Sequence, residues 1–271
     1  MINDEPKFKI LQTTRDKIPP ITDGATPNLQ RIGRRESEPH SEEVSYMYDV
    51  LTTNFPNSRT FWDLHHYFKI DDEEIDLQFD ISFFRNFILK EAVSSFKAEE
   101  FNGRIPDLVI NILSKSTWRI DLLEHVEYCE KLKIPYYIVF TPYDVIKKLY
   151  KPPFLRVYFL KNNKYEHFDF RDITLIEGEY NNIDSTKIID LGESIPFRIG
   201  LMERKRRHLK RGKLYRLVFF DKEKDIMLKS SIEKAIEIAE KERRRAEEER
   251  KRAEHLEKLL KKYKEKFGDI S

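Results

Sequence analysis

The polar side chains that could carry chemistry lie inside two predicted buried strands. Asp107 and Asn111 interrupt an apolar run that begins after Pro106, and Asp80 lies in the alternating run at residues 77–84. A buried carboxylate needs a partner, which is often a metal ion. Two carboxylates on neighbouring strands can hold Mg²⁺, and a bound Mg²⁺ can activate water for attack on a phosphodiester. Asp80 and Asp107 are the candidate ligands of such a site, although spacing alone favours a structural role for Asp107 and Asn111.

The elements around these residues are expected to bring them together. Residues 106–142 contain two continuous apolar runs joined by a helix-length segment, which is typical of a strand–helix–strand unit with both strands covered. The even spacing of Asp107 and Asn111 puts both on one face of the first strand. Asp80 lies on an earlier strand, and His125 on the connecting helix could reach over the strand ends. In the alternative interpretation, Asp107 only opens a strand and Asn111 is a satisfied core amide.

Composition separates the chain into a core and two charged ends. Of the 271 residues, 39% are hydrophobic and 36% are charged, and the net charge is only +2. Residues 1–40 contain five prolines among polar residues, which predicts a disordered N-terminal arm. Residues 41–228 are rich in Phe, Tyr, Ile and Leu and can build a mixed α/β domain, with a central sheet flanked by helices. Residues 229–271 are predicted to form a charged C-terminal helix.

Cysteine usage and hydropathy indicate the compartment. The single cysteine, Cys129, cannot form an internal disulfide and fits a reducing environment. Its place on the predicted helix favours a small buried apolar group over a reactive thiol. No apolar run reaches the roughly 18 residues of a membrane span, and the N-terminus lacks the apolar core of a signal peptide. We therefore predict a soluble, cytoplasmic protein.

Local signals predict further elements around the candidate site. Ser41 is placed to cap a helix that has glutamates in its first turn. A short helix is expected at residues 90–98. Residues 155–170 have the pattern of a β-hairpin, and another strand is expected at residues 214–220.

The C-terminal segment carries a helical repeat. Ser230 or Ser231 can cap a helix that reaches Phe267. Apolar or small residues recur every seven positions, at Ile232, Ala239, Ala246, Ala253, Leu260 and Phe267. Glutamates occupy the second seam position in the middle of the repeat, so a coiled coil here is weak. The alternatives are a single solvated helix supported by Glu-to-basic pairs four residues apart, and self-association through residues 256–267, which we favour.

A dense basic cluster lies near the end of the predicted core. It contains Arg204, Lys205, Arg206, Arg207, Lys210, Arg211, Lys213 and Arg216. Local cationic patches contact phosphates without reading sequence, so this cluster is a candidate for binding the nucleic-acid backbone. The alternative is a solvated loop face whose cations pair with acidic neighbours.

The central segment resembles a known family of nucleases. The stretch Pro106-Asp-Leu-Val-Ile-Asn-Ile-Leu-Ser114, followed by Asp121 and by the strand at residues 136–142, resembles the Uma-type restriction endonucleases of the PD-(D/E)XK nuclease superfamily. The resemblance extends from about residue 41 to the C-terminus, and Asp80 falls on the family's first metal carboxylate. It implies a restriction-endonuclease-like core that cleaves DNA with the help of a metal ion.

Two positions depart from the pattern of that family. The usual catalytic glutamate falls on Asn111, and the usual helical lysine falls on His125. Asn111 keeps an oxygen donor but removes a negative charge, so Mg²⁺ would bind more weakly. His125, with an unperturbed pKa of about 6.5, can replace a lysine only in part near pH 7.

Two hypotheses follow from the resemblance and its departures. In the first, the protein is a DNA endonuclease dependent on Mg²⁺ or Mn²⁺. Asp80, Asp107 and Asn111 hold the metal, and His125 takes the role of the lysine. In the second, it is an inactive nuclease-fold protein that binds DNA or a partner through the basic cluster and the C-terminal helix. In both we expect a homodimer, formed through the core, the C-terminal helix or both.

Overall fold

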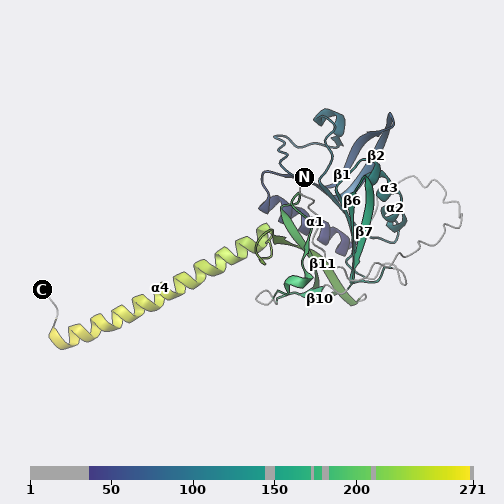
Figure 1. Ribbon diagram of the computed structural model, residues 1–271. Coiled ribbons are helices and arrows are strands. Elements are labelled where there is room, and N and C mark those ends of the chain that lie inside the picture. The colour runs from purple at the N-terminus through teal and green to yellow at the C-terminus, as the bar shows by residue number, and fades with distance from the viewer. Residues whose placement is uncertain (1–36, 144–149, 172–173, 179–182, 209–211, 269–271) are drawn as a thin grey trace. The chain divides into compact units, whose positions relative to one another are not determined.

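Figure 1 shows the computed structural model of the chain, in which residues 37–143, 150–171, 174–178, 183–208 and 212–268 are described. Two compact units are distinguished, Met1–Leu228 and Lys229–Ser271, and each is described by itself. Among the helices of the described ranges, none combines the length and the apolar character needed to cross a membrane.

The first unit is built on a mixed seven-stranded sheet with the strand order β3-β1-β2-β4-β5-β6-β7. Its strands are β1 (Arg59–Ile70), β2 (Glu73–Phe84), β3 (Phe96–Lys97), β4 (Leu108–Ile112), β5 (Tyr136–Thr141), β6 (Phe154–Lys161) and β7 (Lys164–Phe170). Strands β4 and β5 are parallel, and α2 (Trp118–Leu122) and α3 (Glu124–Lys131) form the crossover between them. Every residue of β4 and β5 is buried, as expected for strands covered on both faces.

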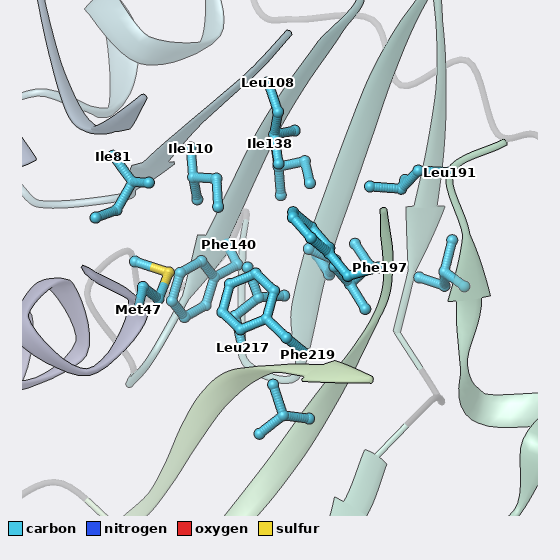
Figure 2. Close-up of a cluster of buried hydrophobic side chains, with 14 of the residues drawn as sticks. Met47, Ile81, Leu108, Ile110, Ile138, Phe140, Leu191, Phe197, Leu217 and Phe219 are labelled. Atoms are coloured by element: carbon cyan, nitrogen blue, oxygen red, sulfur yellow. The ribbon is translucent and has the colours of Figure 1, made fainter. Parts of the chain in front are cut away.

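Helix α1 (Glu38–Asn54) and a second, four-stranded sheet supply the core on one face of the main sheet. The second sheet has the order β11-β10-β8, with β9 paired to β10. Its strands are β8 (Thr174–Ile176), β9 (Ile189–Asp190), β10 (Phe197–His208) and β11 (Gly212–Asp221), and the 3₁₀ turn η2 (Ser185–Lys187) precedes β9. Figure 2 shows this core, where Met47 of α1 and Phe197 and Phe219 of the second sheet cluster with Ile110 and Ile138 of the main sheet.

The opposite face of the main sheet packs against α2, α3 and the 3₁₀ helix η1 (Ala98–Phe101). Its core cluster contains Val109 and Leu113 from the region of β4, together with Leu122 of α2 and Cys129 of α3. Cys129 is fully buried, and burial raises the pKa of its thiol well above the usual value. The prediction that this cysteine is a small buried apolar group is therefore confirmed.

The main sheet, the strand–helix–strand unit and the β6–β7 hairpin confirm the predicted mixed α/β class, but two local predictions were wrong. Helix α1 begins at Glu38 with Ser37 as its N-cap, so Ser41 lies inside the helix. Pro39 belongs to the first turn. A proline is tolerated there because the first backbone N–H groups of a helix have no intrahelical partner. Residues 85–95 form turns and bends in place of the short helix expected at residues 90–98. The rest of the predicted N-terminal arm, residues 1–36, lies outside the described residues.

The second unit is the helix α4 (Ser231–Phe267), which confirms the predicted C-terminal helix. The Ser230 hydroxyl accepts a hydrogen bond from the Glu233 backbone N–H at 3.2 Å, and the Glu233 carboxylate accepts one from the Ser230 N–H at 2.8 Å. This reciprocal capping box satisfies two of the backbone donors that a helix start leaves open. Gly268 ends the helix at a positive φ of 77°, which glycine adopts without strain.

Candidate functional site

Strands β2 and β4 separate at a fork, and two polar side chains lie where the ladder ends. The paired residues run from Phe83 and Leu108 to Ile81 and Ile110, and the next positions are Asp80 and Asn111. Beyond the last backbone pair, side-chain oxygens accept the hydrogen bonds of backbone N–H groups on the other strand. The Asn111 Oδ1 accepts the Asp80 backbone N–H at 3.1 Å.

The carboxylate of Asp80 completes this exchange from the other strand. Its Oδ2 accepts the Ile112 backbone N–H at 2.6 Å. Buried backbone donors are nearly always satisfied in folded proteins, so each of these side chains has a structural role at the fork. The interpretation of Asn111 as a satisfied core amide is therefore supported by its contacts.

The amide nitrogen of Asn111 faces the crossover helices. It donates to the Asp121 Oδ1 at 2.9 Å and lies 3.0 Å from the His125 Nδ1. It also lies 3.3 Å from the Tyr137 hydroxyl, which donates to the Asp121 backbone carbonyl at 2.8 Å. Because the Asn111 oxygen is held by a backbone donor on β2, the orientation of the amide is determined by its surroundings.

This orientation decides how His125 can take part. An amide nitrogen only donates, so the His125 Nδ1 accepts this hydrogen bond and carries no proton in this arrangement. The ring centroid of His125 lies 5.7 Å from that of Phe79 on β2. The side chain is 13% exposed, which leaves it at the margin of the core. The same Nδ1 lies 3.5 Å from the Asp121 Oδ1, and in the hydrogen bond with the Asn111 amide the imidazole is the acceptor.

Two members of this polar cluster were missed in the sequence. His40 of α1 places its Nε2 3.1 Å from the Asp80 Oδ1. It had been assigned to the N-terminal arm, and its separation of 40 residues from Asp80 leaves no local signal. Tyr137 was read as one more apolar residue of β5, although a buried tyrosine hydroxyl needs a hydrogen-bond partner and could have been flagged on that ground.

Asp107 lies apart from the other candidate residues. Its Oδ2 accepts the Arg85 backbone N–H at 2.8 Å and the Arg104 guanidinium at 2.9 Å. It precedes Asn111 by four residues, roughly 13 Å along an extended strand. The structure thus brings together Asp80, Asn111 and His125, but it places Asp107 at the other end of β4.

The side chains at the fork do not fit a divalent metal as they stand. Asp80 uses one carboxylate oxygen for a backbone N–H and the other for a histidine. Asn111 turns its hydrogen-bond donor, not its oxygen, toward Asp121, and a donor nitrogen offers nothing to a hard cation. Within the described ranges, no group of three or more His, Cys, Asp or Glu side chains is arranged to hold a metal ion.

In the structure, the cations of the basic cluster differ in burial and in their partners. Arg204 and Arg216 form ion pairs with Glu43 of α1, which is 2% exposed, at 3.1 Å and 3.0 Å. Burial raises the pKa of the Glu43 carboxyl, and the guanidinium groups of Arg216 and Arg204 oppose that rise. These two arginines therefore serve as internal counter-ions, as in the alternative interpretation of the cluster.

The other cations of the cluster have different surroundings. Lys213 pairs with Glu203 at 2.8 Å but is 60% exposed, and Lys205 is also exposed. The backbone of residues 206–207 belongs to β10, whereas residues 210 and 211 lie outside the described part of the chain.

Comparisons with known proteins add similarity to solved structures. No family model matches the chain, and no curated protein matches it. The chain is similar to the crystal structure of "a putative nuclease belonging to DUF820" from Anabaena variabilis ATCC 29413, with 19% sequence identity and a TM-score of 0.39. The alignment covers 56% of this chain and 75% of that one. A similarity of this size supports no inference about activity, which has to come from the residues themselves.

The hydrogen bonds at the fork predict the effect of one nearly isosteric change. Asn111→Asp replaces the donor that faces Asp121 with a second carboxylate oxygen. We expect the free energy of unfolding at pH 7 to fall by about 1–3 kcal/mol, because a buried hydrogen bond becomes a repulsive contact. The repulsion raises the folded-state pKa of the new carboxyl above its unfolded value, so the deficit should shrink as the pH falls.

Urea denaturation at pH 7 and pH 5 measures both effects. Asn102→Asp is the control, because Asn102 is exposed in a turn after η1 and should tolerate the same change at either pH. Equal decreases in the free energy of unfolding for the two variants would contradict the inferred role of the Asn111 amide.

Proposed function

We propose that the first unit is a nuclease-like domain that binds nucleic acid without hydrolysing it. The observation that carries this proposal is the donation of the Asn111 amide nitrogen to Asp121 and toward His125, at 2.9 Å and 3.0 Å. Phosphodiester hydrolysis by a metal ion requires anionic oxygens around the metal and a group that positions water. The fork instead holds a neutral amide and a neutral imidazole that satisfy each other.

The electrostatics of the fork support binding over cleavage. The second carboxylate of the cluster, Asp121, accepts a hydrogen bond from the Asn111 amide, and position 111 itself offers no negative charge to hold Mg²⁺ together with Asp80. His125 accepts a hydrogen bond from Asn111 and so supplies no positive charge for the developing phosphorane. The cluster stabilises the splayed ends of β2 and β4, which is a structural task.

The case for nucleic acid as the partner comes from the hairpin of β10 and β11. Residues 203–216 contain eight Lys or Arg side chains and one acidic residue. Arg204 and Arg216 pair with Glu43, and Lys213 pairs with Glu203. The same short segment contains five further Lys or Arg residues. Such a concentration of charge binds phosphates with an affinity that falls steeply with salt.

One set of assays on the full chain tests both halves of the proposal. Supercoiled plasmid incubated with Mg²⁺ or Mn²⁺ should stay intact, and fluorescence anisotropy should detect binding of a labelled DNA duplex at low salt. Lys205→Glu/Lys213→Glu should weaken that binding at least about tenfold and lower the salt slope by about 2, because each phosphate contact contributes about 0.9. The matched control is Lys131→Glu/Lys164→Glu, which changes the same charge on α3 and β7 and should bind as the wild type does.

The possible results separate the two claims. Plasmid cutting that needs the metal and disappears in Asp80→Ala would overturn the absence of hydrolysis. A lack of DNA retention at low salt would overturn the binding claim. Equal losses in the two charge-reversal variants would show that the attraction is general and is not located on the β10–β11 hairpin.

A metal-dependent endonuclease is the second candidate, because the fork gathers Asp80, Asn111 and His125, which fall on the metal-ligand and lysine positions of the nuclease pattern. In this candidate Asp80 and Asn111 hold Mg²⁺ or Mn²⁺ and His125 takes the lysine role, with Asp107 outside the site. Asn111→Glu with His125→Lys restores the charges of the nuclease pattern. If an inert wild type gains cutting in this double variant, and loses it again on addition of Asp80→Ala, the fork is a nuclease site that has lost its activity.

A further inference from the structure

The apolar side chains of α4 gather at its two ends. Ile232 and Ile236 near the start are 68% and 54% exposed, and Leu256 and Leu260 near the end are 57% and 58% exposed. Residues 240–252, between them, contain twelve charged residues and one alanine. Apolar groups at this exposure favour burial against a partner surface.

Two heptad positions form one stripe along the helix. The first position holds Ile232, Ala239, Ala246, Ala253 and Leu260, and the second holds Ala235, Glu242, Glu249, Leu256 and Tyr263. Bulky residues of the stripe are confined to the ends, whereas small and acidic residues fill the middle. A partner helix must match large residues with small ones and must keep the glutamates apart.

A parallel pair in register fails on both counts, because it brings identical residues together. The three alanines of the first position would each face an alanine and leave gaps in the seam. Glu242 and Glu249 would each face a glutamate, and opposed like charges at an interface are strongly unfavourable.

An antiparallel pair with its two-fold axis between Glu247 and Glu248 meets both requirements. Its layers across the two copies are Ile232 with Tyr263, Ala235 with Leu260, Ala239 with Leu256, Glu242 with Ala253 and Ala246 with Glu249. Each alanine near an end faces a leucine, and each seam glutamate faces an alanine. Layers that alternate large and small side chains fill the space between helices.

The arginines beside the stripe lie next to the glutamates of the second copy in this arrangement, and the same register sets Arg245 opposite Arg252 of the second copy. Arg245 and Arg252 follow the stripe residues Glu242 and Glu249 by three positions and lie beside them on the helix surface. In the antiparallel pair, Glu249 lies beside Arg245 of the second copy and Glu242 lies beside Arg252 of the second copy. Two-fold symmetry repeats both pairs, so four contacts between opposite charges surround the axis.

We propose that α4 pairs with the α4 of a second copy of this chain as an antiparallel two-stranded coiled coil with these layers. The partner is a second copy because the layers pair large residues with small ones and place each glutamate of the stripe opposite an alanine. This inference is independent of the proposed nucleic-acid binding, since it involves only the second unit.

Disulfide trapping in the full chain tests the orientation. Ala239→Cys and Leu256→Cys are prepared as separate variants and oxidised alone and as an equimolar mixture after subunit exchange. We expect a crosslinked dimer only in the mixture, and mass spectrometry should find one chain of each variant in it. In each variant alone the two introduced cysteines lie roughly 25 Å apart along the axis, beyond the reach of a disulfide.

The controls use the wild type and the outer face of the helix. Arg244→Cys mixed with Leu256→Cys should give no crosslink, and the wild type, whose Cys129 is buried, should give none either. Light scattering should find a wild-type dimer at high micromolar concentration and a monomer for Leu260→Asp. A crosslink in either single-cysteine variant alone would overturn the antiparallel orientation, and a monomeric wild type would overturn the pairing.

Discussion

Arg216→Ala is expected to lower the free energy of unfolding by about 3–5 kcal/mol, the range measured when one partner of a buried ion pair is removed. The Arg216 guanidinium contacts both carboxylate oxygens of Glu43 at 3.0–3.1 Å. It also lies 3.9 Å from the ring centroid of Tyr46. The substitution would leave the buried Glu43 charge with only Arg204 as a close counter-ion and would remove the stacking contact.

Chemical denaturation at pH 7 measures this loss of unfolding free energy. Lys213, three residues before Arg216 on β11, supplies a control. Lys213→Ala removes a cation from the same strand, but Lys213 and Glu203 are 60% and 27% exposed. Exposed pairs are typically worth less than about 1 kcal/mol, so this variant should stay close to the wild type. If the two variants lose similar stability, Glu43 does not depend on Arg216 as its buried counter-ion.

Acidification is expected to remove about 3 kcal/mol of stability through His66 alone. This histidine is fully buried in β1, and burial lowers its pKa from 6.5 to about 4. Its Nδ1 lies 2.7 Å from the Leu64 carbonyl and its Nε2 lies 2.8 Å from the Ser82 hydroxyl, so the neutral ring donates to the carbonyl and accepts from the hydroxyl. Each unit of pKa difference corresponds to about 1.4 kcal/mol between the folded and unfolded states.

The direction follows from the order of the two pKa values. Between pH 6.5 and pH 4 the unfolded chain binds a proton at His66 that the folded chain does not. Stability therefore falls as the pH decreases through this window, and the contribution of His66 is constant below pH 4. Above pH 6.5 both states are neutral and this contribution is again constant.

A variant that cannot be protonated at position 66 isolates the contribution of His66 to the pH dependence of stability. His66→Gln keeps a hydrogen-bonding side chain but cannot be protonated, and the other six histidines titrate in both proteins. Its unfolding free energy should therefore decrease by about 3 kcal/mol less than that of the wild type between pH 7 and pH 4. Parallel pH dependences for the two proteins would show that His66 does not resist protonation in the folded state.

The predicted parts of the site depended on patterns within short stretches of sequence. The apolar runs around Asn111 and residues 136–142 belong to strands buried on both faces, which require continuous apolar sequence. The crossover between two parallel strands must be helical and cover one face, so His125 was expected above the sheet. The resemblance implied that Asp80 and Asn111 share a site, and in the structure the hairpin β1–β2 brings them together by pairing β2 with β4.

The missed parts depended on contacts between distant segments. His40 and Glu43 reach the site region and the basic hairpin because α1 packs against the core, and Arg204 meets Glu43 across 161 residues. No periodicity of a single segment encodes such a contact. Asp107 was expected beside Asp80, but even spacing specifies the face of a strand and not the position along it.

The sequence by itself determined the two covered strands with their helical crossover, the capped C-terminal helix and its heptad stripe, but not the start of α1 or the structure of residues 90–98. These features arise from side-chain periodicity, turn chemistry and capping, which act over a few residues. Only the tertiary structure decided which polar groups are neighbours. The Asn111 amide became the donor at a fork, and two arginines of the basic cluster became counter-ions of Glu43, because buried polar groups must find partners wherever packing brings them.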